Sequence, residues 1–416
     1  MTVAVVGIGL DGQQGLTAKI KQIVLQATVL VGSPRHLDYF LEHPAEKIYL
    51  TDLKLGMEAI AKLDFSLHSI VVLASGDPLF FGIGRLLLEH FDASQVQFFP
   101  HYSSIQLAFS RLKVPWQDAE LVSVHGRSTE QLVKLLKQGK QKIAILTDGN
   151  NNPGAIARLY LALELPLSYS FHVCENLGDK TEKLSHFSGG EIFKLSKFES
   201  DNFASLNVLI LVRQSKANSI DLATLPTVGL PDYSFLSFSD RPGLITKKEV
   251  RLNILGELFL QPSQTVWDIG AGTGSVSIEI ARLCPTSQVY AVEKTSIGST
   301  TIAKNSQRFQ LNNVTSINGK APDALLDLPD PDRIFIGGSG GNLVSILQTC
   351  ADKLTATGII VMAFATIEHQ HQAIDWLSHN GWQYHLLQLQ ISRSIPVGSL
   401  TRFAPLNPVT IITAER

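Results

Sequence analysis

A glycine-rich loop at residues 266–275 carries the clearest chemical signal in the sequence. A strand expected at 265–269 contains Asp268, a G-x-G-x-G loop follows, and a helix is expected over 276–283. Glycines let the backbone turn sharply and approach a ligand, which would lie at the strand's carboxyl end beside a helix N-terminus. The loop residues expected to contact that ligand are Gly270, Ala271, Gly272, Thr273 and Gly274.

Two features of this loop favour S-adenosylmethionine over NAD as the ligand. The dinucleotide fingerprint requires a sixth-position glycine, where this chain has Ser275. Asp268 suits an acceptor for the cationic amino group of a methionine moiety, whereas it would repel an anionic pyrophosphate. Glu293 follows the next expected strand, where an acid can accept hydrogen bonds from both ribose hydroxyls. The alternative interpretation is a plain glycine turn with an exposed glutamate.

Two further loops follow the third and fourth strands expected in this half. Ala321 could face an adenine ring through its backbone, although residues 318–322 would also suit a simple turn. The run at 337–341 offers bare backbone amides where the transferred methyl would lie, and such amides can receive carboxylates. The candidate substrate-binding residues are Gly337, Gly338, Ser339 and Gly340, with a loop that binds nothing as the alternative.

The first half of the chain has a different set of glycine loops. Residues 7–12 formally match G-x-G-x-x-G, but the acid expected about twenty residues later is missing, so we reject NAD there. A sharper signal follows the strand expected at 70–74, where Gly76, Asp77 and Pro78 make a tight loop at a strand's carboxyl edge. Asp77 could hold a ligand amine or hydroxyl, or it could belong to an ordinary Asp-Pro turn.

Both halves alternate short apolar runs with amphipathic stretches, which predicts α/β folds with largely parallel sheets. A polar stretch punctuated by proline and glycine separates them and is typical of a linker. We therefore expect a domain over residues 1–213, a linker over 214–236 and a second domain over 237–416. The halves share no motif order, which favours two different folds over a duplication.

Composition narrows the classes of function. The 416 residues exceed one typical core, and no run of about 18 uncharged apolar residues predicts a membrane span. The 35 Lys and Arg are scattered at a net charge of −2, so nucleic acid is not expected as a partner. Cys174, Cys284 and Cys350 show no zinc or disulfide spacing, which predicts buried or half-buried free thiols, no metal site and a cytoplasmic protein.

Several motifs of the second half together resemble the decarboxylating precorrin methyltransferase domain of cobalamin biosynthesis. They are residues 241–251, 266–275, 321–322, 335–341 and 407–409. The resemblance covers about residues 237–416 and implies a Rossmann-like class I S-adenosylmethionine methyltransferase fold. It implies that Thr246 and the loop from Gly270 to Gly274 contact the cofactor, with Glu293 and Ala321 completing the pocket. Lys294 stands where members of this family often carry arginine.

Motifs of the first half resemble the tetrapyrrole methylase family, in particular its members that methylate a precorrin at a second meso carbon. They are residues 31–37, 72–82, 103–109 and 146–153, in this order. The resemblance covers about residues 1–212 and implies a two-lobed α/β domain with the cofactor in the cleft between the lobes. Gly9 would border the substrate trough, and the cofactor pocket would be lined by Gly76, Asp77, Phe80, Ser103 and Ser104.

The order of the two domains implies a bifunctional methyltransferase acting on a tetrapyrrole. Methyl groups would go to the bridging carbons 5 and 15, and the acetate on ring C would lose its carboxylate. Each domain would bind one S-adenosylmethionine, and single-domain relatives imply a homo-oligomer, a dimer or a tetramer. Methyl transfer from a sulfonium needs no nucleophilic residue, so no catalytic residue is assigned. Acid–base or packing roles both stay open for His101, His125, His369 and His371.

Two other hypotheses remain open at this stage. A fused methyltransferase with another substrate would keep both cofactor motifs, and a regulatory module would bind the cofactor without turnover. The presence of Asp77, Asp268 and Glu293 weighs against the second hypothesis. The sequence leaves open whether the substrate carries cobalt.

Overall fold

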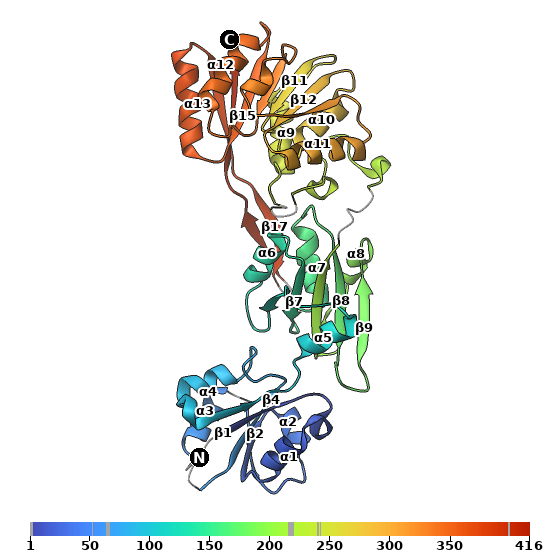
Figure 1. Cartoon of the computed structure of the whole chain (residues 1–416), viewed down its shortest axis with the longest axis vertical. Coiled ribbons are helices and arrows are strands. Elements are labelled where there is room, and N and C mark those ends of the chain that lie inside the picture. The colour runs from blue at the N-terminus through green and yellow to red at the C-terminus, as the bar shows by residue number, and fades with distance from the viewer. Residues whose placement is uncertain are drawn as a thin grey trace. The chain divides into compact units, whose positions relative to one another are not determined.

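The computed structural model describes residues 3–51, 53–63, 67–214, 220–238, 241, 243–397 and 400–416 (Figure 1). Pro242 and the polar run at 215–219, both used in the sequence argument, lie outside the described residues. The chain divides into two compact units. The first comprises Met1–Ser128, Gln141–Gly154 and Ser170–Val212, and the second comprises Thr129–Lys140, Ala155–Tyr169 and Arg213–Arg416.

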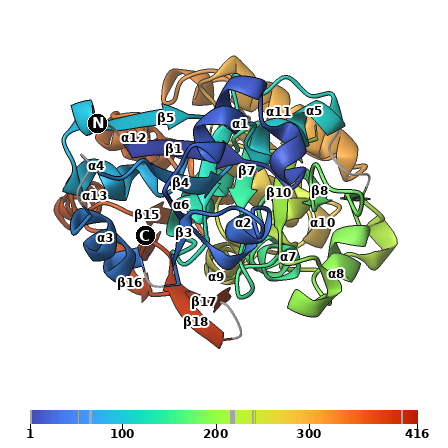
Figure 2. The same cartoon turned by 90° about the horizontal axis from the view of Figure 1, so that it is seen from below.

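The first unit begins with a parallel five-stranded sheet in the order β3-β2-β4-β1-β5. Its strands are β1 (Val3–Ile8), β2 (Val29–Gly32), β3 (Glu46–Tyr49), β4 (Ile70–Ser75) and β5 (Val96–Phe99). Alternate residues of β1 face opposite sides of this sheet. Val3 and Val5 pack toward α3 (Leu53–Ala61) and α4 (Gly84–His90), while Val6 and Ile8 pack toward α1 (Ala18–Leu25) and α2 (Pro34–Asp38) (Figure 2).

The carboxyl ends of β1, β4 and β5 meet closely. The Gly76 N–H donates to the Ile8 carbonyl at 3.1 Å, and the His101 N–H donates to the Gly76 carbonyl at 3.1 Å. A Cβ on Gly7 would lie 1.9 Å from the Gly76 oxygen, so this approach requires glycine. The loops after three parallel strands therefore converge at the edge where α/β sheets bind ligands.

The first half also contains a second, mixed sheet of five strands, in the order β6-β7-β10-β8-β9. Its strands are β6 (Glu120–Ser123), β7 (Lys142–Leu146), β8 (Tyr169–Glu175), β9 (Lys183–Phe187) and β10 (Asn207–Arg213). Helix α5 (Ser104–Leu112) packs Ile105, Ala108 and Phe109 against its buried residues. The remaining helices of this half are α6 (Glu130–Lys137), α7 (Pro153–Ala162) and α8 (Glu191–Leu195). Two sheets in the first half confirm the predicted two-lobed α/β fold.

The second half contains a seven-stranded sheet in the order β13-β12-β11-β14-β15-β19-β16. The first five strands are parallel, and β19 runs antiparallel between β15 and β16. The strands are β11 (Thr265–Ile269), β12 (Gln288–Glu293), β13 (Val314–Asn318), β14 (Arg333–Ile336), β15 (Ile359–Phe364), β16 (Gln383–Leu389) and β19 (Val409–Glu415). This sheet confirms the predicted Rossmann-like fold.

Helices cover both faces of this sheet (Figure 1). Trp267 and Ile269 of β11 pack with α12 (Leu343–Lys353) and α13 (Ile367–His379). Val266 packs on the opposite face with α9 (Lys248–Glu257) and α10 (Ser275–Leu283), and α11 (Ser296–Arg308) follows β12. This alternation buries apolar side chains on both faces and leaves the loops at the carboxyl ends of the strands free to make a site.

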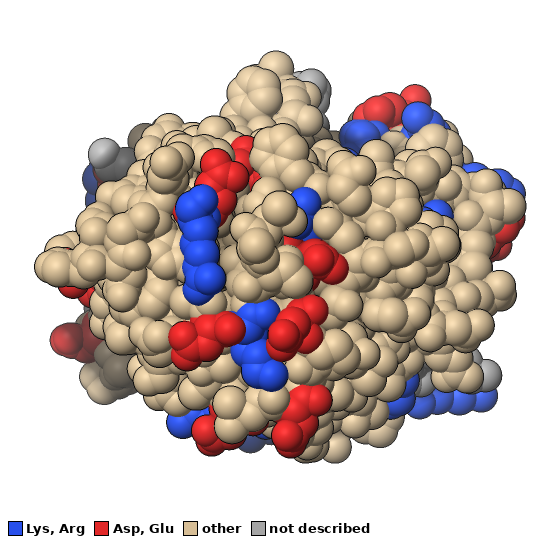
Figure 3. Space-filling view, turned by 90° about the horizontal axis from the view of Figure 1, so that it is seen from above, with Lys and Arg blue, Asp and Glu red and all other residues tan. Residues whose placement is uncertain are grey.

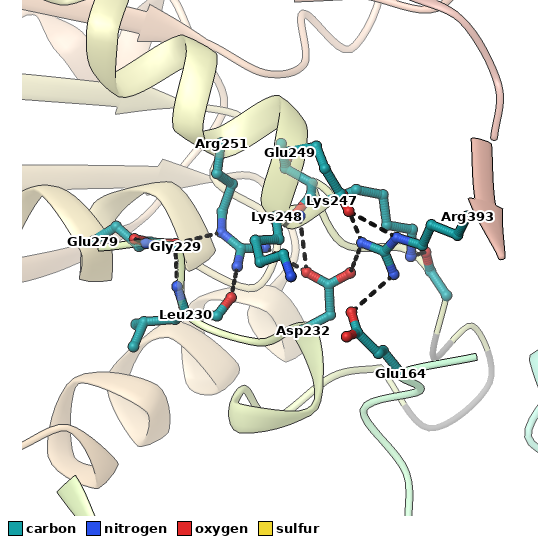
Figure 4. Close-up of polar contacts among 12 residues, drawn as sticks. Glu164, Gly229, Leu230, Asp232, Lys247, Lys248, Glu249, Arg251, Glu279 and Arg393 are labelled. Atoms are coloured by element: carbon teal, nitrogen blue, oxygen red, sulfur yellow. Dashed lines mark hydrogen bonds and ion pairs between the residues drawn. The ribbon is translucent and has the colours of Figure 1, made fainter. Parts of the chain in front are cut away.

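A separate hairpin of β17 (Ser392–Val397) and β18 (Leu400–Pro405) extends from the second half. On it, Arg393 forms ion pairs with Glu164 at 3.1 Å, Asp232 at 3.2 Å and Glu249 at 2.6 Å (Figure 4). Glu164 belongs to the part of the first half that clusters in the second unit. The ion cluster therefore joins sequence segments that are far apart within one compact unit.

Arg251 of α9 is the centre of a second, fully buried group of charges (Figure 4). Its guanidinium donates to Glu279 at 2.8 Å and to Asp232 at 2.7 Å, and also to the Leu230 carbonyl. Glu279 in turn accepts the N–H groups of Gly229 and Leu230. These bonds fix the end of the stretch predicted as a linker, where Leu230, Asp232, Ser234 and Phe235 are buried.

The surface and the thiols complete the description. Basic and acidic side chains are interspersed on the face drawn in Figure 3. None of the described helices combines the length and the apolar character needed to cross a membrane. Cys174 and Cys350 are buried and Cys284 is half-buried, and all three are free thiols, as predicted.

Candidate cofactor and substrate sites

A cavity opens at the carboxyl ends of β11, β12, β13 and β14. Its lining residues are Ile269, Gly270, Val292, Glu293, Lys294, Gly319, Lys320, Ala321, Gly338, Ser339 and Gly340. Six of them are predicted site residues: Gly270, Glu293, Ala321, Gly338, Ser339 and Gly340. The fold therefore gathers loops from four strands into one hollow at the edge that the sequence indicated.

Glycine at position 270 is required by the close approach of two of these loops. Gly270 has a φ of +71°, and a Cβ there would lie 2.3 Å from the Gly338 carbonyl oxygen. The Gly337 N–H donates to the Ile269 carbonyl at 2.9 Å, which holds the second loop against the first. A larger residue at position 270 would push the two walls of the cavity apart.

Asp268 lies beneath the glycine loop and is completely buried. Its Oδ2 accepts the Ser277 N–H at 3.1 Å and the Ser277 hydroxyl, while Oδ1 has no hydrogen-bond partner among the described residues. Burial raises the pKa of Asp268 to about 6, against the lowering effect of the bonds from Ser277. A buried carboxylate oxygen without a partner fits the ammonium group of a methionine moiety, which would supply the missing donor.

Glu293 stands at the end of β12 and is almost buried. Its Oε2 accepts the Gly272 N–H at 3.2 Å, and its Oε1 accepts the Thr295 N–H at 3.0 Å and hydroxyl at 2.8 Å. These bonds orient the carboxylate against the glycine loop. Oε2 accepts only one of these bonds and keeps a second lone pair, so the group can still accept a hydrogen bond from a ribose.

Several predicted cofactor residues shape the site without lining the cavity. Gly272 meets Glu293, and Gly274, with a φ of +76°, precedes α10 as its N-cap. The Thr273 carbonyl accepts the Asn305 side-chain amide at 2.8 Å. The other predicted cofactor residues outside the lining are Thr246, Asp268 and Ala271, and the predicted substrate-binding residue Gly337 also lies outside it. The cofactor and substrate contacts of these residues stay predictions.

Thr246 lies in the loop before α9, and buried charged side chains bind the backbone of this loop. The buried Arg251 guanidinium donates to its carbonyl at 2.5 Å, and Asp232 accepts the Lys248 N–H at 3.0 Å. The neighbouring Lys247 donates to the Gly243 carbonyl at 3.1 Å, and burial lowers its pKa. The ion cluster therefore fixes the loop that carries the predicted cofactor contact.

Lys294 and Lys320 line the cavity and were not predicted. A Cβ on Gly340 would lie 3.4 Å from the Lys294 Nζ, so this ammonium rests over the glycine-rich run at 337–341. Both lysines are next in sequence to predicted residues, Glu293 and Ala321. This adjacency is the sequence feature that could have identified them. They give the cavity a cationic rim that suits carboxylate groups.

In the first half, the Gly-Asp-Pro loop follows β4 as expected. Asp77 is half-buried, and its Oδ1 accepts the Leu79 N–H at 2.9 Å, while its Oδ2 accepts no hydrogen bond from the described residues. Ser103 is the N-cap of α5, where its hydroxyl accepts the Gln106 N–H at 3.3 Å. Gly76 approaches it closely, since a Cβ there would lie 3.0 Å from the Ser103 Cα.

The other predicted residues of this half lie near the same edge or pack behind it. Ser104 is the first residue of α5, and Phe80 packs against the apolar cluster that contains Ile105. Gly9 lies against His101, because a Cβ there would be 2.9 Å from the imidazole Cε1. His101 was noted from the sequence without an assigned role. Cofactor and substrate contacts at these residues stay predictions.

Two family models match the chain, one in each half. Residues 2–192 match the tetrapyrrole (corrin/porphyrin) methylases, and residues 238–416 match the precorrin methyltransferase domain. These matches correspond to the two resemblances that the motifs indicated.

Similar proteins cover either the whole chain or one half. The precorrin-6Y C(5,15)-methyltransferase [decarboxylating] of a Sinorhizobium species is 32% identical over 408 residues, covering 98% of this chain and 94% of that protein. The cobalt-precorrin-6B C(15)-methyltransferase (decarboxylating) of Salmonella typhimurium is 36% identical over 188 residues, which are 45% of this chain and 96% of that protein.

Among solved structures, a precorrin-6Y C5,15-methyltransferase from Geobacter metallireducens is 38% identical, with a TM-score of 0.44 over 47% of this chain and 99% of that one. The family assignment rests on the sequence match that spans nearly the full length of both proteins. On that evidence the chain belongs to the family of decarboxylating precorrin-6Y C(5,15)-methyltransferases.

Proposed function

We propose that this chain is an S-adenosylmethionine-dependent methyltransferase of cobalamin biosynthesis that methylates a precorrin-6Y-type tetrapyrrole at carbons 5 and 15. It also decarboxylates the acetate on ring C, giving precorrin-8X. The observation that carries the proposal is the full-length match to relatives that bear this name, combined with a glycine-lined cavity beside Asp268 and Glu293.

Each half binds one S-adenosylmethionine, which supplies an electrophilic methyl group when bound. In the second half, Asp268 receives the ammonium group, Glu293 the ribose and the Ala321 backbone the adenine. The second-half ligand set also includes Thr246 and Gly270 to Gly274. In the first half, the cofactor lies against Gly76, Asp77, Phe80, Ser103 and Ser104. The support is the partnerless Asp268 oxygen in one half and the convergent loops after β1, β4 and β5 in the other.

The two reactions divide between the halves. The second half performs decarboxylation and methylation at carbon 15, since a relative of its size carries that name. The first half methylates carbon 5. The amides of Gly337, Gly338, Ser339 and Gly340 receive substrate carboxylates beside Lys294 and Lys320, and Gly9 borders the substrate in the first half. Closing the substrate over these groups removes water, which favours loss of the ring C carboxylate.

Domain limits and assembly belong to the same proposal. We place the first domain at residues 1–213, the linker at 214–236 and the second domain at 237–416, in keeping with the limits of the two family models. The chain forms a homo-oligomer, a dimer or a tetramer, in the cytoplasm. A monomer in light scattering at micromolar concentration would contradict the assembly.

Turnover by the full chain tests the function. Incubation with a precorrin-6Y substrate and S-adenosylmethionine should give a product with two added methyl groups and release carbon dioxide, both followed by mass spectrometry. A parallel reaction with the cobalt-containing substrate separates the two forms of the tetrapyrrole. Methyl transfer to neither substrate would contradict the proposal.

A further inference from the structure

A carboxylate and an imidazole meet beside Gly9 at the carboxyl edge of the first sheet. Asp11 follows β1 and His101 follows β5, and Asp11 Oδ1 lies 3.8 Å from His101 Nε2. The His101 side chain is only 12% exposed, whereas the Asp11 side chain is 39% exposed. The carboxylate is therefore the member of the pair that a bound ligand can reach, with the imidazole behind it.

Helix capping does not explain Asp11. It occupies the N-cap of the short 3-10 helix η1 (Gly12–Gly15), but its side chain makes no capping hydrogen bond. At three other helix starts, the N-cap side chains of Thr17, Ser33 and Ser103 do accept a backbone N–H. The Asp11 carboxylate faces His101 in place of the helix N–H groups.

Two glycines leave room for this carboxylate. A Cβ on Gly9 would lie 2.6 Å from Asp11 Oδ1, and a Cβ on Gly15 would lie 2.2 Å from Oδ2. Side chains at either position would displace the Asp11 carboxylate. Glycine at positions 9 and 15 therefore leaves space for the Asp11 carboxylate beside the Gly9 backbone.

His101 is held in position at the same edge. Its N–H donates to the Gly76 carbonyl at 3.1 Å, which ties it to the Gly-Asp-Pro loop after β4. Its ring meets Tyr102 edge to face at 5.6 Å between centroids. Its Nδ1 is buried and has no hydrogen-bond partner among the described residues. The ring is thus fixed by backbone and packing, with Nε2 toward Asp11.

Methylation of carbon 5 requires a proton acceptor. Forming the C5–CH3 bond uses a π electron pair of the ring system and breaks the S–CH3 bond, whose electron pair stays on sulfur. The tetrapyrrole then carries one additional positive charge, and carbon 5 bears both a hydrogen and a methyl group. Conjugation returns only when the C5–H bond breaks, its electron pair enters the ring system, and the proton leaves.

Resting on the proposed function, we propose that the Asp11 carboxylate accepts this proton, and that His101 acts as a positioning residue that orients Asp11. A cationic carbon acid is strong enough for a carboxylate to deprotonate, so a base of ordinary strength suffices. His101 Nε2 lies 3.8 Å behind the carboxylate, so the buried ring limits the positions that the Asp11 side chain can take. Gly9, with no side chain, lets the substrate approach the pair.

The test uses the full chain and follows methylation at carbons 5 and 15 separately by mass spectrometry of the products. Asp11→Asn should lower kcat for carbon 5 by about 10²–10⁴-fold with KM nearly unchanged. Methylation at carbon 15 and release of carbon dioxide should keep their wild-type rates. With substrate deuterated at carbon 5, the variant should show a larger isotope effect than the wild type, because C5–H cleavage becomes rate-limiting.

Calorimetry measures cofactor binding independently of activity. The matched control variant is Asp92→Asn. Asp92 is the exposed N-cap of another 3-10 helix in the same half, η2 (Ala93–Gln95), and its loss should not slow methylation. Asp11→Asn should still bind two S-adenosylmethionine molecules per chain. His101→Asn should lower kcat by a smaller factor and add little in the Asp11→Asn background, as expected for residues acting through one group.

An Asp11→Asn chain that methylates carbon 5 at the wild-type rate overturns this inference alone, and so does one that loses a cofactor site. If Asp11→Asn does not fold, Asp11→Glu and His101→Asn decide: reduced kcat at unchanged KM supports the proposal, and wild-type values overturn it. A wild-type chain that never methylates a precorrin overturns the proposed function as well.

Discussion

Two buried aspartates in the second half show how differently a fold can treat the same side chain. Asp232 is 1% exposed and is paired with Arg251 and Arg393, and it also accepts a backbone N–H from Lys248. Asp268 is 0% exposed, has no cationic partner among the described residues, and keeps one oxygen without any hydrogen bond. Buried charges in proteins are normally paired, because an unpaired one costs several kcal/mol.

The difference separates a structural carboxylate from one kept for a ligand. Asp232 has its partners within the chain, so it fixes the loop before α9. Asp268 lies under the glycine loop with its charge unbalanced, and burial raises its pKa to about 6. A cation arriving from outside would remove that imbalance, so the unfavourable state of the free protein becomes affinity for the ligand.

The largest expected effect is on cofactor binding by Asp268→Asn. The substitution keeps the shape and the bond from Ser277 but removes the charge that the ammonium group needs. S-adenosylmethionine affinity at this site should fall by about 10²–10⁴-fold, as for loss of one partner of a buried ion pair of about 3–5 kcal/mol. Calorimetric titration measures it. The free variant should melt no lower than the wild type, because an unpaired buried charge is gone, and a large drop in Tm would count against the account.

Asp232→Asn is the matched control, and it should lower the stability of the fold while largely preserving cofactor affinity. It breaks pairs to Arg251 and Arg393, so unfolding in denaturant should show a loss of about 3 kcal/mol. At temperatures where the variant is folded, the second-half cofactor site should stay within an order of magnitude of its wild-type affinity. Equal stability of the variant and the wild type would show that the network is not structural.

Glu293→Gln should have an intermediate effect on the same site. Glutamine keeps one acceptor oxygen for Gly272 or Thr295 but loses the charge-assisted bonds to the ribose. Each lost bond of that kind contributes about 1.5–3 kcal/mol. Adenosine analogues without ribose hydroxyls offer the comparison, since they should bind the variant and the wild type alike. If the variant still binds S-adenosylmethionine more tightly than the analogues without ribose hydroxyls, Glu293 is not the residue that contacts the ribose.

The pH dependence of binding should be the smallest of these effects. The Asp268 pKa is raised to about 6 in the free protein, so the ammonium-binding form is complete above about pH 7 and is lost as pH falls through 6. Affinity at this site should then fall by about tenfold per pH unit, while Asp268→Asn removes the dependence. Calorimetry between pH 5 and 8 tests this, and an affinity that rises on acidification would reverse the assigned sign.

Sequence patterns predicted the strands that have continuous apolar runs and did not predict the strands with many exposed residues. Strands β4 and β11 were located within about two residues because most of their residues are buried. Strands β3, β9 and β16 carry exposed residues and give no such run. Their place in the sheets depends on pairing with distant strands, which local patterns do not encode.

The candidate sites divide in the same way. Gly270 and Glu293 were found because a turn and a strand end are local features of the sequence. The Arg251 and Arg393 clusters and the pairing of Asp11 with His101 depend on contacts between distant segments, so no spacing rule could reveal them. Lys294 and Lys320 lay next to predicted residues, but only the assembled cavity shows that they line it.

Calorimetric titration of the full chain with S-adenosylmethionine tests the central claim most directly. Two cofactor sites of different construction should give two molecules bound per chain, and Asp268→Asn should leave one. That remaining site should be the one lost on substituting Asp77 with alanine. One site in the wild type, or an Asp268→Asn chain that still binds two molecules tightly, would contradict the account.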